Sequence, residues 1–206
     1  MQTERFLKFI FFLALFTSVL TVNLYLLLSP SYVTWQYSRL TVDSGSARPD
    51  TGKALAIVDY LKHKTDRLPM LSYKERSHLA DVRHVFDIGL NAFKPAFAVL
   101  IIAAALLVKS LSRRQVWRTL ALCGVGGIAI LTGLSWAMLL NFSWMFSHFH
   151  GLFFAGDSWI FGTDSLLIRL FPFQFWVRAG LHWALLTMSE LALIAAAAVT
   201  AGRYQP

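Results

Sequence analysis

The chain has 206 residues, of which 56% are hydrophobic and 15% are charged, and its formal net charge is +8. This apolar content excludes an ordinary soluble domain. It also argues against nucleic-acid binding, which needs a basic face on a soluble domain. The lone cysteine, Cys123, excludes an intrachain disulfide and a Cys-x-x-Cys metal motif.

Four apolar windows approach the roughly 20 residues that a helix needs to cross a bilayer. The first window is too long for the apolar part of a signal peptide, so we interpret it as an uncleaved span. We therefore predict an all-α integral membrane protein, with residues 1–206 forming a single membrane domain. Its predicted spans are residues 9–28, 92–108, 119–140 and 179–201.

Basic residues predict the orientation of these spans, because short cytoplasmic loops carry an excess of lysine and arginine. The loop between the second and third spans is basic and has no acidic residue, and both chain ends are also basic. Both termini are therefore predicted to be cytoplasmic, and segments 29–91 and 141–178 to lie outside. The basic residues are Arg5, Lys8, Lys109, Arg113, Arg114, Arg118 and Arg203.

The first outer segment contains several predicted short elements. Residues 32–41 alternate roughly between β-branched or aromatic and other residues, which is compatible with a short strand. Residues 43–53 are rich in turn formers, and residues 54–62 have the pattern of a short helix. The expected architecture is a four-helix membrane protein under an extracellular cap of short helices, with short strands as an option.

A longer helix is predicted to begin at Ser72, because Ser72 and Glu75 have the spacing of a capping box. At 100° per residue, His78 lies at the edge of an apolar stripe and His84 lies on the far side. His78 is therefore expected to face the protein or the membrane surface, and His84 to face water. Pro95 marks a break before the second span or lies early within it.

The second outer segment, residues 141–178, is unusually aromatic, as expected for chain at the headgroup level of a bilayer. We expect it to re-enter the membrane or to lie along its outer surface. Asp164 is expected to cap a short helix over 165–171 that ends at Pro172. The preceding span contains glycines that suit close helix packing: Gly124, Gly126, Gly127 and Gly133.

Histidines in the two outer segments are the candidates for chemistry, because histidine exchanges a proton near neutral pH. His78 can act as a general base, with Asp81 close enough on a helix to orient its ring and favour the protonated state. Arg76 can meet anionic headgroups. The second candidate, His150, can equally be a polar tip in an aromatic belt.

Two other histidine or acid sites are open alternatives. His148 and His150 on a strand, together with His78, would supply three ligands to an open zinc site. Glu190 lies inside the fourth span, where we favour a structural, hydrogen-bonded role over a functional one. His182 in the same span has no assigned role.

The two outer segments resemble the bacterial lipoprotein intramolecular transacylases, and the resemblance extends over essentially the whole chain. The first motif reads Glu75-Arg-Ser-His78-Leu-Ala-Asp81-Val. The second reads Phe149-His150-x-Leu-Phe-Phe and is followed by Trp159-x-Phe, Asp164-x-Leu-Leu and Phe171-Pro172. His78 and His150 fall on the two key histidines of that family.

The resemblance implies an acyltransferase of the cell membrane whose active site faces the extracellular side. One acyl chain of a diacylglyceryl lipoprotein would move from the sn-2 ester to the α-amino group of the N-terminal cysteine, producing the lyso-form. It implies His78 and His150 as catalytic residues, with no cofactor or metal ligand, and lipoprotein and membrane lipid as partners. Arg76, Asp81, Trp159 and Asp164 are expected to bind substrate, although Arg76, Asp81 and Asp164 can also serve only the fold.

Two alternatives remain. The first is a non-catalytic membrane protein of envelope assembly, whose histidines only belong to the aromatic belt. The second is a metal-dependent hydrolase acting at the outer face.

Overall fold

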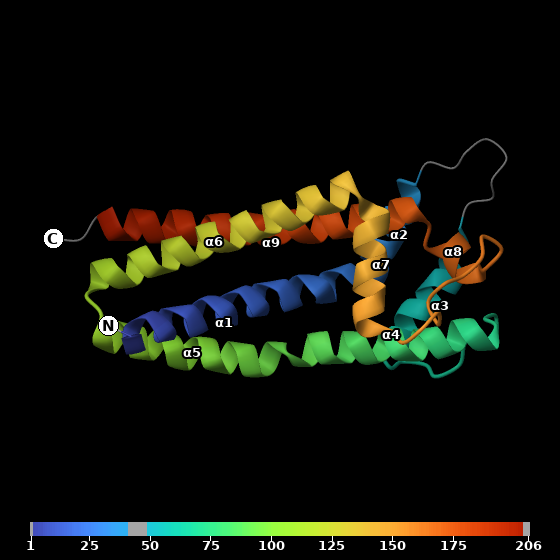
Figure 1. Ribbon diagram of the computed structural model, residues 1–206, viewed down its shortest axis with the longest axis horizontal. Coiled ribbons are helices and arrows are strands. Elements are labelled where there is room, and N and C mark those ends of the chain that lie inside the picture. The colour runs from blue at the N-terminus through green and yellow to red at the C-terminus, as the bar shows by residue number, and fades with distance from the viewer. Residues whose placement is uncertain (1, 41–48, 204–206) are drawn as a thin grey trace. The chain divides into compact units, whose positions relative to one another are not determined.

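The computed structural model describes residues 2–40 and 49–203, and the regular secondary structure in these ranges is entirely helical (Figure 1). The helices are α1 (Gln2–Leu27), α2 (Pro30–Ser38), α3 (Thr51–Leu61), α4 (Tyr73–Asn91), α5 (Phe93–Ser110), α6 (Arg113–Leu140), α7 (Phe142–Phe153), α8 (Leu166–Leu170) and α9 (Phe173–Arg203).

Four helical stretches are long and apolar enough to cross a membrane: α1, the stretch Tyr73–Ser110, α6 and α9. Each overlaps one predicted span almost completely, and the predicted fold class is confirmed. The helices extend beyond the apolar windows. The predicted break near Pro95 is confirmed, since α4 ends at Asn91 and α5 begins at Phe93. Pro95 is in the first turn of α5, where a missing N–H leaves no helical bond unmade.

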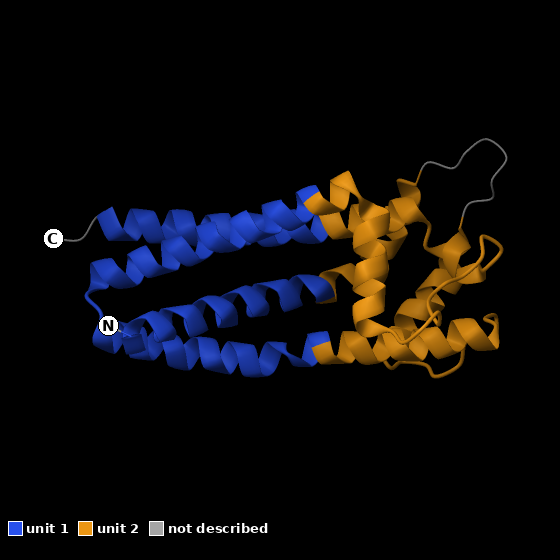
Figure 2. Cartoon of the chain, viewed as in Figure 1, with its two compact units in different colours: residues 1–24, 89–136, 182–206 blue, residues 25–88, 137–181 orange. Residues whose placement is uncertain are grey.

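The chain forms two compact units (Figure 2). Unit 1 contains residues 1–24, 89–136 and 182–206, and unit 2 contains residues 25–88 and 137–181. The candidate site histidines all belong to unit 2, whereas Glu190 and His182 belong to unit 1. The single membrane domain over residues 1–206 stays a prediction.

Unit 1 is held together by an apolar cluster and by two polar links between α1 and α9. The cluster joins α1, α5 and α6 through Phe11, Leu15, Ala103, Leu107 and Cys123.

The first polar link of unit 1 is centred on the fully buried Asn23 of α1. Its side-chain N–H₂ donates to Thr187 Oγ1 at 3.0 Å and to Glu190 Oε2 at 2.8 Å. In the second link, Trp183 Nε1 donates to the Leu20 carbonyl at 3.0 Å. Glu190 is therefore hydrogen-bonded to a neighbouring helix, as the structural interpretation expects.

The glycines of α6 differ in what they face. A Cβ added at Gly124 would lie 2.7 Å from the Leu191 carbonyl oxygen, and one at Gly127 would lie 2.7 Å from Leu191 Cδ1. These two glycines permit close approach to α9, as predicted. At Gly133 an added Cβ meets nothing within 4 Å, so the packing role predicted there is wrong.

Replacing Gly124 with alanine is expected to destabilise the protein by about 1–3 kcal/mol, the usual cost of overpacking. The added methyl group can be accommodated only by moving backbone, because its nearest neighbour is a carbonyl oxygen. Thermal unfolding in detergent measures the effect. Gly133→Ala is the matched control and should leave stability unchanged or slightly raised, and equal losses in the two variants would contradict this reason.

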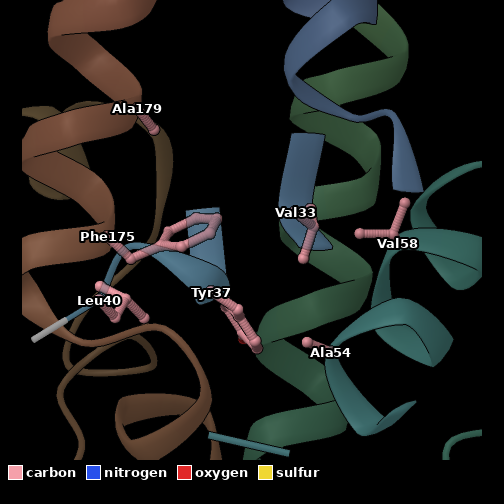
Figure 3. Close-up of a cluster of buried hydrophobic side chains, with 7 residues drawn as sticks. All are labelled: Val33, Tyr37, Leu40, Ala54, Val58, Phe175 and Ala179. Carbon is pink, nitrogen blue, oxygen red and sulfur yellow. The ribbon is translucent and has the colours of Figure 1, made fainter. Parts of the chain in front are cut away.

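In unit 2, α2 and α3 pack with the N-terminal part of α9 around a buried cluster (Figure 3). The Tyr37 ring meets the Phe175 ring edge-on with a centroid distance of 5.9 Å. Tyr37 Oη donates to the Leu170 carbonyl at 2.5 Å, which links α2 to α8. The cluster consists of Val33, Tyr37, Leu40, Ala54, Val58, Phe175 and Ala179.

The short strand considered for residues 32–41 is wrong, because residues 30–38 are the helix α2. Ser29 caps this helix by accepting from the Tyr32 N–H, and Pro30 follows in the first helical turn. Proline favours that position because its N–H would be unpaired anyway. The buried side chains Val33 and Tyr37 follow helical spacing rather than alternation.

Part of the predicted turn-rich loop, residues 43–48, lies outside the described residues, as does Thr41 at the end of the strand prediction. The remainder is partly helical. Asp50 accepts from the Lys53 N–H and caps α3, so this helix begins three residues earlier than predicted.

Candidate active site

Glu75 fixes the N-terminal end of α4. The predicted capping box is confirmed, since the Ser72 N–H donates to Glu75 Oε2 at 2.8 Å and the Glu75 N–H donates to Ser72 Oγ at 3.3 Å. Glu75 Oε1 accepts two further bonds from the second outer segment, at 2.6 Å from Ser165 Oγ and at 3.2 Å from the Leu167 N–H. One buried carboxylate therefore joins the start of α4 to the segment between α7 and α9.

Hydrogen bonds keep Glu75 charged although its side chain is only 5% exposed. Burial alone would raise its pKa, but the bonds from Ser165, Ser72 and Leu167 outweigh burial and lower the pKa of Glu75 to about 2. Sequence reasoning recognised Glu75 as a helix cap, but its bonds to residues 165 and 167 leave no signal in a single sequence.

His78 lies one turn further along α4 and is 7% exposed, whereas His84 is exposed, as the helical phase predicts. The His78 ring contacts Phe154 and Phe161, with centroid distances of 4.9 Å and 5.4 Å. An aromatic wall from the second outer segment therefore shields His78 from water.

His150 lies on α7 and faces His78. The two imidazole centroids are 6.2 Å apart, with an interplanar angle of 27°. His150 Nδ1 lies 2.8 Å from the Phe146 carbonyl oxygen. Because a carbonyl only accepts, we assign the proton to Nδ1, which leaves the Nε2 lone pair of neutral His150 available.

Both histidines are disposed to be neutral at physiological pH. The pKa of His78 is lowered to about 4. Burial is the main cause, and the nearby His150 and Lys74 contribute in the same direction. Burial likewise lowers the pKa of His150, against the opposing effect of its bond to Phe146. Asp81 raises the pKa of His78, which is the predicted direction, but burial outweighs this effect.

The aromatic ring of Trp159 is the next component of the site, with its centroid 4.9 Å from that of His150. Among the described residues, Trp159 Nε1 has no hydrogen-bond partner although it is buried, and the same is true of Ser158 Oγ and His78 Nδ1. Buried polar atoms normally have partners, so the unpartnered atoms of His78, of Trp159 and of its neighbour Ser158 favour a polar ligand beside the histidine pair. Sequence reasoning missed Ser158, because an isolated serine in a loop carries no signal.

Three residues that were predicted to bind substrate are not part of the histidine pair: Arg76, Asp81 and Asp164. Arg76 donates to the Leu71 carbonyl at 2.5 Å and so supports the loop before α4. Asp81 is exposed, and within the described part of the chain it makes no hydrogen bond to His78. Asp164 is exposed and does not cap the following helix, because the N-cap residue of α8 is Ser165. The capping role predicted for Asp164 is wrong.

The zinc alternative assumed that His148 and His150 lie on a strand. They lie on the helix α7, where residues two apart point about 200° apart. His148 is exposed and its Nδ1 bonds to the Trp144 carbonyl. Among residues 2–40 and 49–203, no three metal-ligating side chains form a group that could hold a metal ion.

The model of the family described as "Lipoprotein intramolecular transacylase Lit" matches residues 6–176, which is most of the chain and includes both histidine motifs. The chain belongs to this family. It is therefore an acyltransferase enzyme, and the resemblance seen in the two motifs is confirmed.

Solved structures of the Lit transacylase from Bacillus cereus, described as membrane-integral, have the same fold. One is 17% identical and superposes with a TM-score of 0.74 over 99% of both chains. Two variants of that protein, in which a histidine is replaced by arginine or by alanine, give TM-scores of 0.66 and 0.67 at 17% and 16% identity. They cover 98% of this chain and 92% and 93% of their own. No curated protein matches.

The family fold and the four apolar helices show a multi-pass membrane protein whose substrate class is lipoproteins. The family model includes both the α4 region and the α7–α8 region that form the histidine pair. Since α8 is only five residues long, we attribute its order to the bonds that Ser165 and Leu167 donate to Glu75.

The lowered pKa of His78 predicts that stability falls on acidification. Between pH 6.5, the ordinary pKa of histidine, and pH 4, the unfolded chain binds a proton at His78 and the folded state does not. The contribution of neutral His78 to the free energy of unfolding is complete above pH 6.5, and it is lost as the pH falls towards 4. The unfolding temperature in detergent should drop over this range.

The matched variants for this pH series are His78→Leu and His84→Leu. His78→Leu should show a weaker dependence on pH, with the remainder due to His150, and exposed His84→Leu should follow the wild type. Identical pH profiles for wild type and His78→Leu would contradict the assignment.

Proposed function

We propose that the enzyme transfers one acyl chain from the sn-2 ester of a diacylglyceryl lipoprotein to the α-amino group of its own N-terminal cysteine. The observation that carries this proposal is the pair of neutral imidazoles, of buried His78 and half-buried His150, with ring centroids 6.2 Å apart in a protein of this family. The basic loops that favour cytoplasmic termini support an outward-facing site.

The reaction needs a base, because an α-amino group with a pKa of about 7.7–8.0 is mostly protonated at neutral pH. A neutral imidazole removes one proton, and the freed nitrogen attacks the ester carbonyl carbon. A C–N bond forms and the C–O bond to glycerol breaks. The nitrogen gives up a second proton and the glycerol oxygen takes one up, so that one proton is released overall. Donor and acceptor belong to one molecule, so the reaction balances without any further reactant.

The geometry supports a division of roles between the histidines. His150 offers its Nε2 lone pair, because the Phe146 carbonyl holds the proton on Nδ1. We infer that His150 accepts the amine proton and that His78 stabilises the oxyanion or passes a proton to the glycerol oxygen. The reverse assignment, with His78 as the base, uses the same pair.

The unpartnered polar atoms beside the pair fit the polar part of this substrate. We propose that Trp159 Nε1 donates to the ester carbonyl oxygen and that Ser158 Oγ contacts the glycerol. The surrounding phenylalanine rings would bind the acyl chains. Arg76, Asp81 and Asp164 lie outside this arrangement and would act through headgroup contacts or through the fold.

Trp159→Phe is expected to lower turnover by about 10²-fold, in line with the loss of one oxyanion donor, because it keeps a ring but removes the N–H. Initial rates with a diacylglyceryl lipopeptide measure the effect. Trp144→Phe on α7 is the control, since Trp144 is exposed. Equal rates for wild type and Trp159→Phe would contradict a role as donor.

The direct test uses purified protein in vesicles with a synthetic diacylglyceryl lipopeptide whose sn-2 acyl chain is isotopically labelled. The expected product has an unchanged mass, but fragmentation places the label on the α-amino nitrogen. When the labelled substrate also carries a second isotope label in its peptide and is mixed with unlabelled substrate, no product with only one of the two labels should form. Crossed products would overturn the intramolecular step.

The same experiment separates the alternatives. Release of labelled free fatty acid that stops on addition of a chelator would favour the metal-dependent hydrolase. Absence of any lipid change, with normal envelope assembly in His78 and His150 variants, would favour a non-catalytic protein.

A further inference from the structure

Unit 1 contains a groove of about 670 Å³ that the histidine chemistry does not use. It lies along α1 and α6, and its volume is in the range of roughly 300–1,000 Å³ that is typical of ligand sites. Its rim, near the N-terminal ends of α1 and α6, is polar and consists of Lys8, Gln115 and Arg118. The remainder of the lining is largely apolar.

The apolar part of the groove follows one face of α6. Four lining positions are spaced four residues apart and therefore lie on one face of the helix: Arg118, Leu122, Gly126 and Ile130. The distance from Arg118 to Ile130 corresponds to about 18 Å of helix. This is close to half of the roughly 30 Å hydrocarbon core of a bilayer, the depth of one leaflet.

Gly126 keeps the groove open. A Cβ added there would meet only Phe12, at 3.7 Å, so the glycine is not required for contact with another helix. Leu122 and Ile130 are 60% and 44% exposed, respectively, and present an apolar surface along the floor.

The rim of the groove carries positive charge. Lys8 shares its charge with Glu4 through a contact of 2.5 Å, but exposed Arg118 makes no ion pair within the described residues. A guanidinium binds phosphate with two parallel hydrogen bonds. A cationic rim above an apolar channel one leaflet deep is complementary to an anionic headgroup with its acyl chain.

We propose that this groove binds one anionic phospholipid, with its phosphate at Lys8 and Arg118 and one acyl chain along Leu122, Gly126 and Ile130. The basic residues near the rim belong to the loops predicted to be cytoplasmic, so the lipid comes from the inner leaflet. The site is separate from the acyl-transfer chemistry, because all of its lining residues belong to unit 1.

Titration of the purified full chain in mild detergent with phosphatidylglycerol and with phosphatidylcholine tests the proposal. Native mass spectrometry counts the retained lipid, and the unfolding temperature reports binding. Phosphatidylglycerol should bind more tightly, and Arg118→Gln should weaken its binding about fivefold, the effect of one basic residue near anionic lipid. Arg113→Gln, at an exposed arginine on the same helix outside the groove, should retain wild-type binding.

A second pair of variants tests the acyl channel. Gly126→Leu should obstruct it and weaken binding of both lipids, whereas Gly133→Leu should not, because that position faces open space. Equal loss in Arg118→Gln and Arg113→Gln, or phosphatidylcholine binding as tightly as phosphatidylglycerol, would overturn the proposal. Retained binding in a folded Gly126→Leu variant would also overturn it, and the arginine pair decides the matter if that variant does not fold.

Discussion

Replacing His78 with alanine is expected to lower the rate of N-acylation by about 10²–10⁴-fold, the usual contribution of a general acid or base. The variant loses the imidazole that lies 6.2 Å from His150 and leaves His150 without a partner for proton transfer. Rates with the labelled lipopeptide measure this effect, and fragment ions identify the position of the acyl chain.

His84→Ala is the matched control for this prediction. His84 is on the same helix but is exposed, so its replacement should leave the rate within about twofold of the wild type, as for most surface changes. His78→Ala must also be shown to fold, by its unfolding temperature at neutral pH. A folded His78→Ala variant that produces lyso-form lipopeptide at the wild-type rate would exclude a catalytic role.

Replacing Glu75 with alanine is expected to destabilise the protein by about 3 kcal/mol, because hydrogen bonds to a charged group contribute roughly 1.5–3 kcal/mol each and the donors are left unpaired. Ser165, Leu167 and Ser72 would all lose their acceptor. Chemical unfolding in detergent measures the change. Activity should fall as well, since His78 is one turn from the lost anchor.

The pH dependence of this stabilisation has a definite sign. The carboxylate has a pKa of about 2 in the folded state and an ordinary value of 4.5, so its contribution is complete above pH 4.5 and fades as the pH falls towards 2. Glu75→Gln should remove this acid-dependent part. Asp81→Ala, an exposed carboxylate on the same helix, is the control, and an equal loss in both variants would exclude a specific anchor.

Local sequence patterns made the membrane helices predictable from the sequence. Apolar windows, basic loops and the capping box at Ser72 each depend on neighbouring residues, and the structure confirms the four spans and the start of α4. The segment at 32–41 was ambiguous, because aromatic and β-branched residues are common in strands and also in buried helices. Packing against α3 and α9 determines that α2 is helical.

The candidate site was partly predictable for the same reason. Helical phase identified the buried side of α4, and the motifs drew attention to His78 and His150. Their distance, the tautomer of His150 and the aromatic wall of Phe154 and Phe161 depend on contacts between segments far apart in the sequence. The dominance of burial over the attraction of Asp81 could be found only from the folded surroundings of His78.

The bonds of Glu75 to Ser165 and Leu167 also have a consequence for how the enzyme is made. The first pair is separated by 90 positions. At about 5–20 residues per second, a ribosome needs roughly 5–20 s to synthesise that stretch. During this interval water must take the place of Ser165 and Leu167 at Glu75 Oε1, and no aromatic wall covers His78. A nascent chain therefore completes the surroundings of His78 only late in translation, once the segment between α7 and α9 has been delivered to the same side of the membrane as the start of α4.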